Sequence, residues 1–537
     1  MSTTPTTDPR GTELPVWSTI GELVDSAVER FGDAEALVDG EQRWSWRHLV
    51  ERIHGAGRAA LAAGIGHGDR VAVWAPNVAE WVVAALGVHQ VGGVVVPINT
   101  RFKGHEAADL IRRSGARILF TVTDFLDTDY VALLDEAGRP PGLEQVVVLR
   151  GTVPAGTVAF DEWLAAGADV DDAERAARAE AVTADDLCHI MFTSGTTGRP
   201  KGAMLTHGAI CRAYRSWASV IGLEPRDRYL IVNPFFHSFG LNAGILACFM
   251  TGATMIPHAV FDVPSVMRRV AEERVSMLPG PPAIYQTILN HPDLDRLDLS
   301  SLRLAVTGAA AIPVEMIRQM YDRLGFETVV TGYGLTEASG IATMCRHDDD
   351  PETIANTSGR AIDDVEVRVV DENGDEVPRG TPGEIVVRGY NVMVGYLDDP
   401  EATAEAIDAD GWLHTGDVGV MDERGYVDIT DRLKDMFIVG GFNAYPAEIE
   451  GMLLEHPDIA QVAVVGVPDE RLGEVGWAFV VPTAGHAVDP DAVITWSRER
   501  MANYKVPRRV VVVDALPLNA SGKVLKYELR ERAASLA

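Results

Sequence analysis

The most constraining feature of this sequence is a short apolar run that ends in a loop rich in glycine and hydroxyl side chains. Residues Leu187 to Phe192 form the apolar run, which predicts a buried strand. A helical pattern follows the loop, with Thr206 as its N-cap. Its buried face is predicted to carry Ile210, Tyr214, Trp217 and Ile221. A strand, a loop and a helix in this order are typical of an α/β domain.

The loop between these elements has the composition of a polyphosphate cradle. Glycines let the backbone approach a ligand and turn its N–H groups inward, hydroxyl groups add donors, and a lysine adds positive charge. The spacing is not that of a Walker A loop, because only two residues separate Gly195 from Gly198 and Pro200 precedes the lysine. A functionless surface loop is the alternative. The residues are Thr193, Ser194, Gly195, Thr196, Thr197, Gly198 and Lys201.

Composition sets the broad class of the protein. A chain of 537 residues is too long for one ordinary core, and its 47% apolar and 23% charged content are those of a soluble globular protein. The apolar region Trp81 to Ile98 is interrupted by His89, Gln90 and glycines, so it predicts a buried helix and strand rather than a membrane span. Residues 1–13 lack a basic start and an apolar core, which predicts a disordered tail and no secretory signal.

Charge and cysteine usage argue against several further classes of function. The net charge of −31 argues against binding nucleic acid and against electrostatic attachment to an anionic membrane. The four cysteines are scattered and form no CxxC pair, which indicates a reducing cytoplasmic environment and no cysteine metal site. The expected partners are therefore small molecules, and a homodimer is left open.

The loop resembles the signature of a known group of enzymes. Phe192 to Gly202 is similar to the phosphate loop of the adenylate-forming enzymes, which include acyl-CoA synthetases, firefly luciferase and peptide-synthetase adenylation domains. Three further stretches resemble that group in the same order: Val329 to Gly340, Trp412 to Asp417, and Leu516 to Lys523. The resemblance implies ATP-dependent activation of a carboxylate, with Mg²⁺ and coenzyme A.

The resemblance also implies an architecture. It predicts an α/β fold with a large N-terminal domain at residues 14–431, including a β-barrel-like subdomain. A hinge at residues 432–435, with Lys434 at its centre, would lead to a small mobile α+β domain at residues 436–537. Lys523 on the small domain would serve adenylation, and rotation about Lys434 would then bring a glycine turn toward the thiol path for thioester formation.

The resemblance assigns a nucleotide site residue by residue. Tyr333 would stack on adenine, Thr336 would donate to the α-phosphate, and Glu337 with Thr193 would hold Mg²⁺. Thr331 and Gly332 depart from the amide or acidic side chain that often reads adenine in relatives. The full ATP and AMP set adds to the loop Gly308, Ala309, Ala310, Thr331, Gly332, Tyr333, Gly334, Leu335, Thr336, Asp417, Arg432 and Lys523, with Asp417 and Arg432 at the ribose.

The resemblance also assigns an acyl site and a coenzyme A site. His237 would lie over the carboxylate entrance and is counted with Lys201, Thr336, Glu337 and Lys523 among the catalytic residues. The acyl pocket would be lined by Phe239, Ala243, Gly308 and Gly332, and the coenzyme A path by Gly440, Gly441 and Phe442. No acidic residue lies between Phe235 and Met250, which favours an uncharged acyl group because a buried cation would need a partner.

The substrate is the least constrained part of the hypothesis. Most of the chain resembles an actinobacterial subgroup that ligates coenzyme A to the bicyclic, indane-type ring propanoate left by sterol degradation. A medium- or long-chain fatty acid is the alternative substrate. Two other functions stay open, an enzyme that loads a carrier protein and an inactive acyl-adenylate or lipid-binding homologue. Retention of Lys201, Glu337, Asp417 and Lys523 argues against inactivity.

Overall fold

The computed structural model describes residues 13–193, 200–308, 312–432, 435–439, 442–444, 446–469, 472–501, 503–518 and 524–536. The chain divides into two compact units. The first comprises Met1–Val367 and Val387–Leu413, and the second Arg368–Val386 and His414–Ala537. The mixed α/β fold with a large first unit confirms the predicted fold class.

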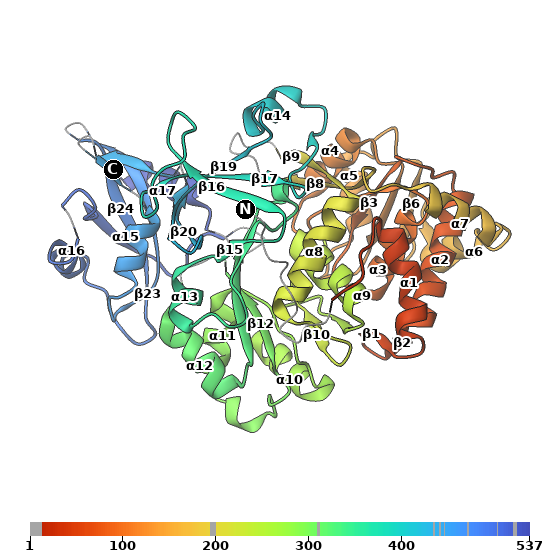
Figure 1. The fold of residues 1–537 in the computed structure, drawn as a ribbon, viewed down its shortest axis with the longest axis horizontal. Helices are drawn as coiled ribbons and strands as arrows, with labels where there is room; N and C mark the ends of the chain where they lie inside the picture. The colour runs from red at the N-terminus through yellow and green to blue at the C-terminus, as the bar shows by residue number, and fades with distance from the viewer. Residues whose placement is uncertain are drawn as a thin grey trace. The chain divides into compact units, whose positions relative to one another are not determined.

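The first unit is built on an eight-stranded sheet in which the predicted strands lie side by side (Figure 1). Strands β4, β3, β5, β6 and β7 are parallel, and the β8–β9 pair is antiparallel. Along the sheet the order is β18 (Gly395–Tyr396), β9 (Lys201–Thr206), β8 (Leu187–Thr193), β4 (Val94–Pro97), β3 (Arg70–Trp74), β5 (Ile118–Val122), β6 (Gln145–Arg150) and β7 (Val158–Ala159).

Helices pack against this sheet, and α1, α2 and α3 lie side by side in Figure 1. The predicted buried helix is α3, whose residues are nearly all inaccessible, and it runs into the buried strand β4 as expected. The helices are α1 (Ile20–Phe31), α2 (Trp46–Ala62), α3 (Ala79–His89), α4 (Gly104–Ser114), α5 (Tyr130–Ala137), α6 (Phe160–Ala165), α7 (Asp172–Ala181) and α8 (His207–Ile221).

Helix α8 follows the predicted pattern. The Thr206 side chain accepts a hydrogen bond from the backbone N–H of Ala209, as an N-cap does. Its face with Ile210, Tyr214 and Trp217 is buried. The sequence did not predict strand β9, which lies between the phosphate loop and this helix.

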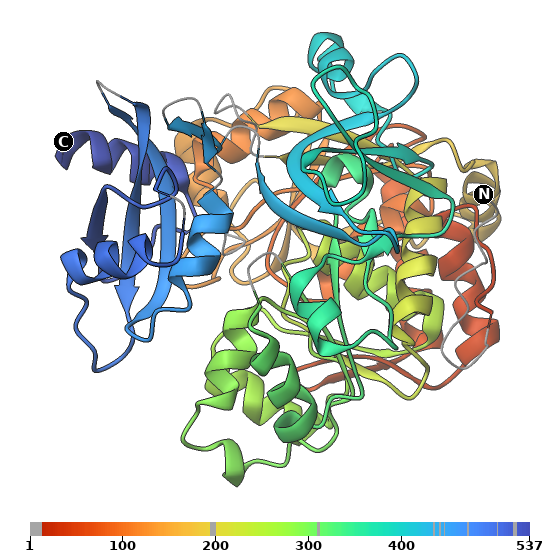
Figure 2. The same ribbon diagram turned by 60° about the vertical axis from the view of Figure 1, so that its left-hand side comes forward.

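Two smaller sheets complete the first unit. One has the order β10 (Arg228–Ile231), β11 (Thr254–Pro257), β1 (Glu35–Asp39) and β2 (Gln42–Ser45), and the other β12 (Leu304–Thr307), β13 (Thr328–Tyr333), β14 (Thr343–Met344) and β15 (Arg360–Ala361). Figure 2 shows the green helices α10, α11 and α12 grouped beside β12 and β13. The helical segments are η1 (Phe239–Leu246), α9 (Ala247–Thr251), α10 (Val263–Glu273), α11 (Pro282–Leu289), η2 (Leu294–Arg296), α12 (Val314–Leu324), η3 (Thr336–Ala338), α13 (Pro351–Asn356) and α14 (Pro400–Ala406).

The remaining sheets lie wholly or largely in the second unit. A four-stranded sheet has the order β16 (Val365–Val370), β17 (Gly383–Gly389), β19 (Leu413–Met421) and β20 (Val427–Arg432). The C-terminal sheet has the order β22 (Phe442–Ala444), β21 (Phe437–Val439), β24 (Gly473–Pro482) and β23 (Ile459–Asp469), with β25 (Arg509–Val512) paired to β24. Its helices are α15 (Pro446–Leu453), α16 (Pro490–Arg498) and α17 (Lys526–Leu536).

Candidate active site

The predicted phosphate loop is closed by a strand pair. Strands β8 and β9 run antiparallel, with Thr193 opposite Lys201 and Phe192 opposite Gly202. The Thr193 hydroxyl oxygen lies 3.4 Å from the Lys201 carbonyl oxygen. The two ends of the loop are therefore held together by the sheet. Ser194, Gly195, Thr196, Thr197 and Gly198 lie outside the described residues.

Glu337 reaches this loop from a different part of the fold. It lies in η3, directly after β13, where the chain turns tightly at Gly334. A Cβ atom at Gly334 would fall 2.4 Å from the Gly340 carbonyl oxygen, so the turn requires glycine. Glu337 Oε1 accepts a hydrogen bond from the Thr193 hydroxyl over 3.2 Å. Two residues predicted to hold Mg²⁺, far apart in the sequence, thus lie in contact.

Tyr396 joins the two charged members of the site. Its hydroxyl donates to Glu337 Oε1 over 2.9 Å, and the Lys201 ammonium lies 5.0 Å from the centre of its ring. Burial raises the pKa of Tyr396, and the Glu337 carboxylate adds to that rise, so the hydroxyl keeps its proton. Sequence reasoning missed this residue. The sequence shows only a tyrosine directly after Gly395. The structure places both residues in the short strand β18, which pairs with β9.

The predicted adenine segment lies at the ends of two parallel strands. Thr307 of β12 is opposite Thr331 of β13. A Cβ atom at Gly308 would lie 3.4 Å from the Gly332 carbonyl oxygen, so the two predicted glycines are neighbours. Ala309 and Ala310 lie outside the described residues. Tyr333, Leu335 and Thr336 are half-buried, and Gly334 is exposed.

Thr331, also predicted to lie at the adenine site, makes its hydrogen bonds within the protein. Its hydroxyl lies within hydrogen-bond distance of the carbonyl oxygens of Thr357 (2.9 Å) and Ile354 (3.1 Å), and its own carbonyl accepts from the N–H of Cys345. The side chain is buried. Its polar groups therefore hold strand β13 in place, and the predicted nucleotide contact would have to come from its neighbours.

The predicted acyl residues lie where η1 begins. His237 keeps an exposed face, and its Nδ1 accepts a hydrogen bond from the Phe239 N–H over 3.2 Å. The protein atoms around the imidazole lower the pKa of His237, which favours its neutral form. Phe239 is half-buried, and its ring meets the Trp217 ring edge-on at 6.2 Å. Ala243 is fully buried.

The second unit carries the predicted ribose residues. Asp417 of β19 and Arg432 of β20 are opposite each other in an antiparallel pair. The Asp417 side chain is buried and its backbone N–H donates to the Thr415 hydroxyl. Phe442 begins strand β22. Leu518 and Val524 form an antiparallel bridge on either side of the predicted lysine turn. Lys523, Lys434, Gly440 and Gly441 lie outside the described residues.

Comparison with known proteins identifies the family. The profile described as "AMP-binding enzyme" matches residues 24–397, and its C-terminal domain profile matches residues 448–523. The chain belongs to the AMP-binding enzyme family.

Individual relatives narrow the comparison within this family. The chain is 50% identical to the "3-[(3aS,4S,7aS)-7a-methyl-1,5-dioxo-octahydro-1H-inden-4-yl]propanoyl:CoA ligase" of Rhodococcus jostii, over 97% of this chain and 99% of the relative. It is also 50% identical to the ligase of the same name from Mycobacterium tuberculosis, over 96% and 98%. The structure of ATP-bound MatB from Rhodopseudomonas palustris matches with a TM-score of 0.83 at 31% identity, over 96% and 99%.

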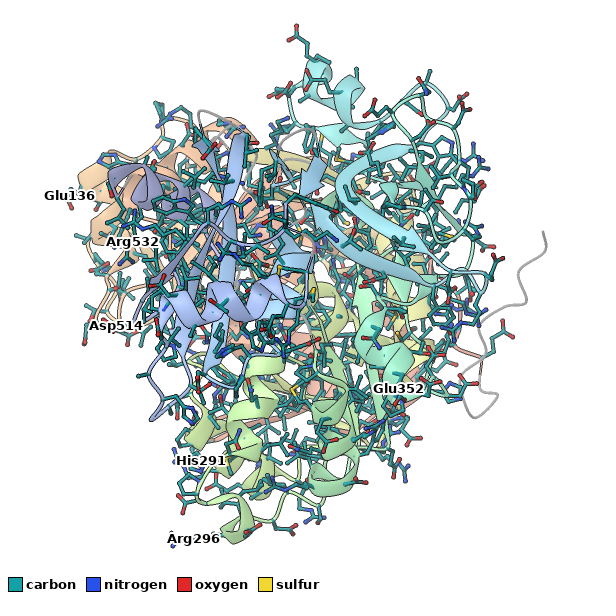
Figure 3. The ribbon with its side chains drawn as sticks, turned by 90° about the vertical axis from the view of Figure 1, so that its left-hand side faces the viewer. Glu136, His291, Arg296, Glu352, Asp514 and Arg532 are labelled. Atoms are coloured by element: carbon teal, nitrogen blue, oxygen red, sulfur yellow. The ribbon has the colours of Figure 1, made fainter. Side chains whose placement is uncertain are left out.

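These findings confirm the enzyme class predicted from the sequence, an AMP-forming acyl-CoA synthetase that uses ATP and coenzyme A. In the part of the chain that the structure describes, no group of three or more His, Cys, Asp or Glu side chains is arranged to hold a metal ion. None of the helices in the described ranges is long and apolar enough to cross a membrane. Figure 3 labels His291, Arg296 and Glu352, charged or titratable side chains that are not among the predicted site residues.

Proposed function

We propose that this AMP-binding enzyme ligates coenzyme A to a bicyclic indane-dione propanoate, the acid named in its two 50% identical relatives. The observation that carries the proposal is identity at this level over nearly the whole of both chains, to two ligases that share one named acid. The acyl segment is compatible with a neutral ring substrate, because Phe235 to Met250 contains no acidic side chain.

The first half-reaction joins the acid to ATP. A carboxylate oxygen attacks the α-phosphorus, the bond to the bridging oxygen breaks, and pyrophosphate leaves. Because nucleophile and electrophile are both anionic, catalysis consists mostly of positioning and charge neutralisation. Lys201 at the loop and Lys523 on the small domain would supply positive charge, and Thr336 would donate to the α-phosphate. The neutral imidazole of His237 would lie over the carboxylate entrance.

The contact between Thr193 and Glu337 suits Mg²⁺ carried in with the nucleotide. Mg²⁺ keeps several waters and takes one or two carboxylates together with phosphate oxygens. Both hydrogen bonds to the Glu337 carboxylate from described residues end on Oε1, so Oε2 has no donor among them. The ion, when bound, would neutralise phosphate charge. Glu337 would hold it, and Tyr396 would keep the carboxylate in place.

The second half-reaction transfers the acyl group to the thiol of coenzyme A and releases AMP. Lys523 would not be needed for this step. We infer that the C-terminal domain, from residue 436 onward, rotates about Lys434 and brings Gly440, Gly441 and Phe442 toward the thiol path. Rotation about a short hinge is a common closing motion in enzymes. The four cysteines are buried and free, which supports the proposal that the protein works in the reducing cytoplasm.

The proposal is tested by steady-state kinetics across a panel of acids. Pyrophosphate release and acyl-CoA formation would be measured with ATP, Mg²⁺ and coenzyme A. The panel would contain the indane-dione propanoate, aryl acids, and short, medium and long fatty acids. We expect the highest kcat/KM for the ring propanoate. A higher kcat/KM for any linear acid would contradict the proposed substrate, and would favour the fatty acid alternative.

A further inference from the structure

Strand β19 turns sharply just before Asp417, the predicted ribose carboxylate. Gly416 adopts a left-handed backbone conformation with a φ of +68°, although it lies inside the strand. A Cβ atom at this position would meet no atom of the described residues within 4 Å, so the backbone conformation, and not crowding, favours glycine. A glycine in this conformation bends a strand, and bends of this kind re-aim side chains and are frequent next to active sites. The side chain that follows the bend here is that of Asp417.

Glu384, on the neighbouring strand β17, holds this turn through both of its carboxylate oxygens. Oε1 accepts the backbone N–H of Gly416 over 3.0 Å, and Oε2 lies 2.8 Å from Nδ1 of His414. Because an ionised carboxylate can only accept hydrogen bonds, Nδ1 of His414 is the donor in this pair. The Glu384 side chain is only 18% exposed. It therefore fixes the two residues on either side of Thr415.

Thr415 adds two further hydrogen bonds to the turn. Its hydroxyl donates to the carbonyl oxygen of Ile385 over 2.6 Å and accepts from the backbone N–H of Asp417 over 3.1 Å. Glu384 and Ile385 are successive residues of β17, so one short stretch of this strand holds the three residues that precede Asp417. The direction of the Asp417 side chain therefore depends on side-chain contacts, and not on regular strand geometry alone.

We propose that Glu384 is a positioning residue for nucleotide recognition, which holds the turn that aims the Asp417 carboxylate at the ribose hydroxyls. This inference rests on the proposed function, in which ATP is bound with Asp417 at its ribose. A carboxylate that accepts from two neighbouring hydroxyls has to be held in one orientation. Without Glu384 the N–H of Gly416 loses its acceptor, and a glycine is free to leave the left-handed conformation. The loss should therefore affect recognition of the ribose, and not binding of the acid.

The proposal is tested by comparing ATP with 2′,3′-dideoxy-ATP, which lacks both ribose hydroxyls, in wild-type enzyme and in Glu384→Ala. Pyrophosphate release would be measured with Mg²⁺, coenzyme A and the acid that wild-type enzyme uses best. We expect wild-type enzyme to prefer ATP by a factor on the order of a hundred or more in kcat/KM. In Glu384→Ala that preference should fall by about tenfold, through lost activity with ATP, while the KM for the acid stays within about twofold.

Two further variants separate positioning from stability. Glu384→Gln keeps an oxygen for the N–H of Gly416, and its amide can donate to Nδ1 of the other His414 tautomer, so its preference for ATP should stay within about threefold of wild type. Asp422→Ala is the matched control, because Asp422 Oδ1 also accepts two backbone N–H groups, those of Arg424 and Tyr426, in the turn after β19. It should lower the Tm and keep the wild-type preference for ATP.

Equal losses with the two nucleotides in Glu384→Ala would show that Glu384 is structural, and would overturn the proposal. If Glu384→Ala does not fold, Thr415→Val provides the test, because it removes the hydroxyl that accepts from the Asp417 N–H. A lowered preference for ATP in that variant supports the proposal, and equal losses with ATP and its dideoxy analogue overturn it.

The test also distinguishes this inference from the proposed substrate. If a linear acid is used best and Glu384→Ala loses its preference for ATP, the proposed substrate is wrong and the role of Glu384 stands. If the ring propanoate is used best and Glu384→Ala keeps the full preference, the role of Glu384 is wrong and the substrate stands. Equal use of ATP and its dideoxy analogue by wild-type enzyme would overturn the ribose assignment of Asp417 and this inference together.

Discussion

At the scale of single residues, the candidate site depends on a contact that no local sequence pattern shows. Tyr396 donates to Glu337 and stacks under Lys201, although 59 positions separate it from Glu337. Catalysis gains when charged groups are held in a fixed geometry. The ring and the hydroxyl of Tyr396 therefore position two charged groups with opposite roles.

Tyr396→Phe should weaken adenylation by roughly tenfold, because a hydrogen bond to a charged group contributes about 1.5–3 kcal/mol and part of that is lost. The ring, and with it the contact to Lys201, is kept. The apparent Mg²⁺ concentration needed for half-maximal pyrophosphate release should rise, since Glu337 is less firmly held. Titration of Mg²⁺ in the first half-reaction measures both effects.

A suitable control is Tyr527→Phe, which removes a hydroxyl from a tyrosine that is 56% exposed. That variant should match the wild-type enzyme. An unchanged Mg²⁺ requirement in Tyr396→Phe would show that the tyrosine does not position Glu337.

At the scale of secondary-structure elements, three buried histidines join the base of the phosphate-loop hairpin to the helices around it. His89 ends α3, His189 lies in β8 and His207 begins α8. His89 and His189 approach within 3.2 Å through their Nε2 atoms, and His207 Nδ1 accepts from the Ile20 N–H at the start of α1. Four elements thus meet in a cluster that excludes water.

Protonation of this cluster should destabilise the protein. Burial lowers the pKa of His89 to about 4, and lowers the pKa values of His189 and His207 well below the ordinary 6.5. The unfolded chain therefore takes up these protons between about pH 6.5 and 4 while the folded chain does not. The free energy of unfolding should fall with falling pH, by about 1.4 kcal/mol per unit for each histidine that remains neutral in the fold.

Urea unfolding of wild-type protein and His89→Gln across this pH range measures the contribution. The variant should show a slope smaller by about 1.4 kcal/mol per pH unit, whatever its stability at pH 7. His291→Gln, at the peripheral position labelled in Figure 3, should keep the wild-type slope. Equal slopes for all three proteins would mean that the cluster does not control acid stability.

The secondary-structure elements differ in how well the sequence alone predicted them. Periodicity and capping predicted β8, α3, β4 and the start of α8, because these depend on local spacing and on apolar side chains that are buried whatever their neighbours. Strand β9 was missed, since Lys201 to Thr206 has weak strand character and is held by pairing with β8. The π-helical winding of η1 (Phe239–Leu246) was also not predicted.

The candidate site was predictable to a similar extent. Motifs supplied Thr193, Lys201 and Glu337, which the structure brings together, and Asp417 opposite Arg432. Motifs could not supply Tyr396, whose importance lies in contacts formed by folding. They also could not reveal that the Thr331 hydroxyl is engaged by the carbonyls of Ile354 and Thr357.

At the scale of the whole molecule, a strongly acidic chain must bind three anionic substrates. With a net charge of −31, positive charge has to be concentrated where phosphate is handled. In the proposed mechanism, Lys201 of the first unit and Lys523 of the C-terminal domain supply this positive charge. Because the domain rotates between steps in this proposal, Lys523 would be present for adenylation and withdrawn for thioester formation.

Lys523→Ala should therefore affect the two half-reactions unequally. Adenylation should fall by a factor on the order of 10²–10³, as loss of a charge-stabilising group does. Thioester formation from a supplied acyl-adenylate should be nearly unchanged. Lys103→Ala, at a position outside the four motifs in the sequence, serves as the control and should leave both steps intact. Equal losses in the two half-reactions would refute the assigned role.

The most direct test of the account is to trap the intermediate. Enzyme would be mixed with ATP, Mg²⁺ and the indane-dione propanoate without coenzyme A, quenched, and analysed for the acyl-adenylate by mass spectrometry. Coenzyme A would then be added to a parallel sample. We expect the ring-propanoyl adenylate to accumulate and to be converted to its coenzyme A thioester with release of AMP. Absence of this adenylate, under conditions where a fatty acid forms one, would contradict this expectation.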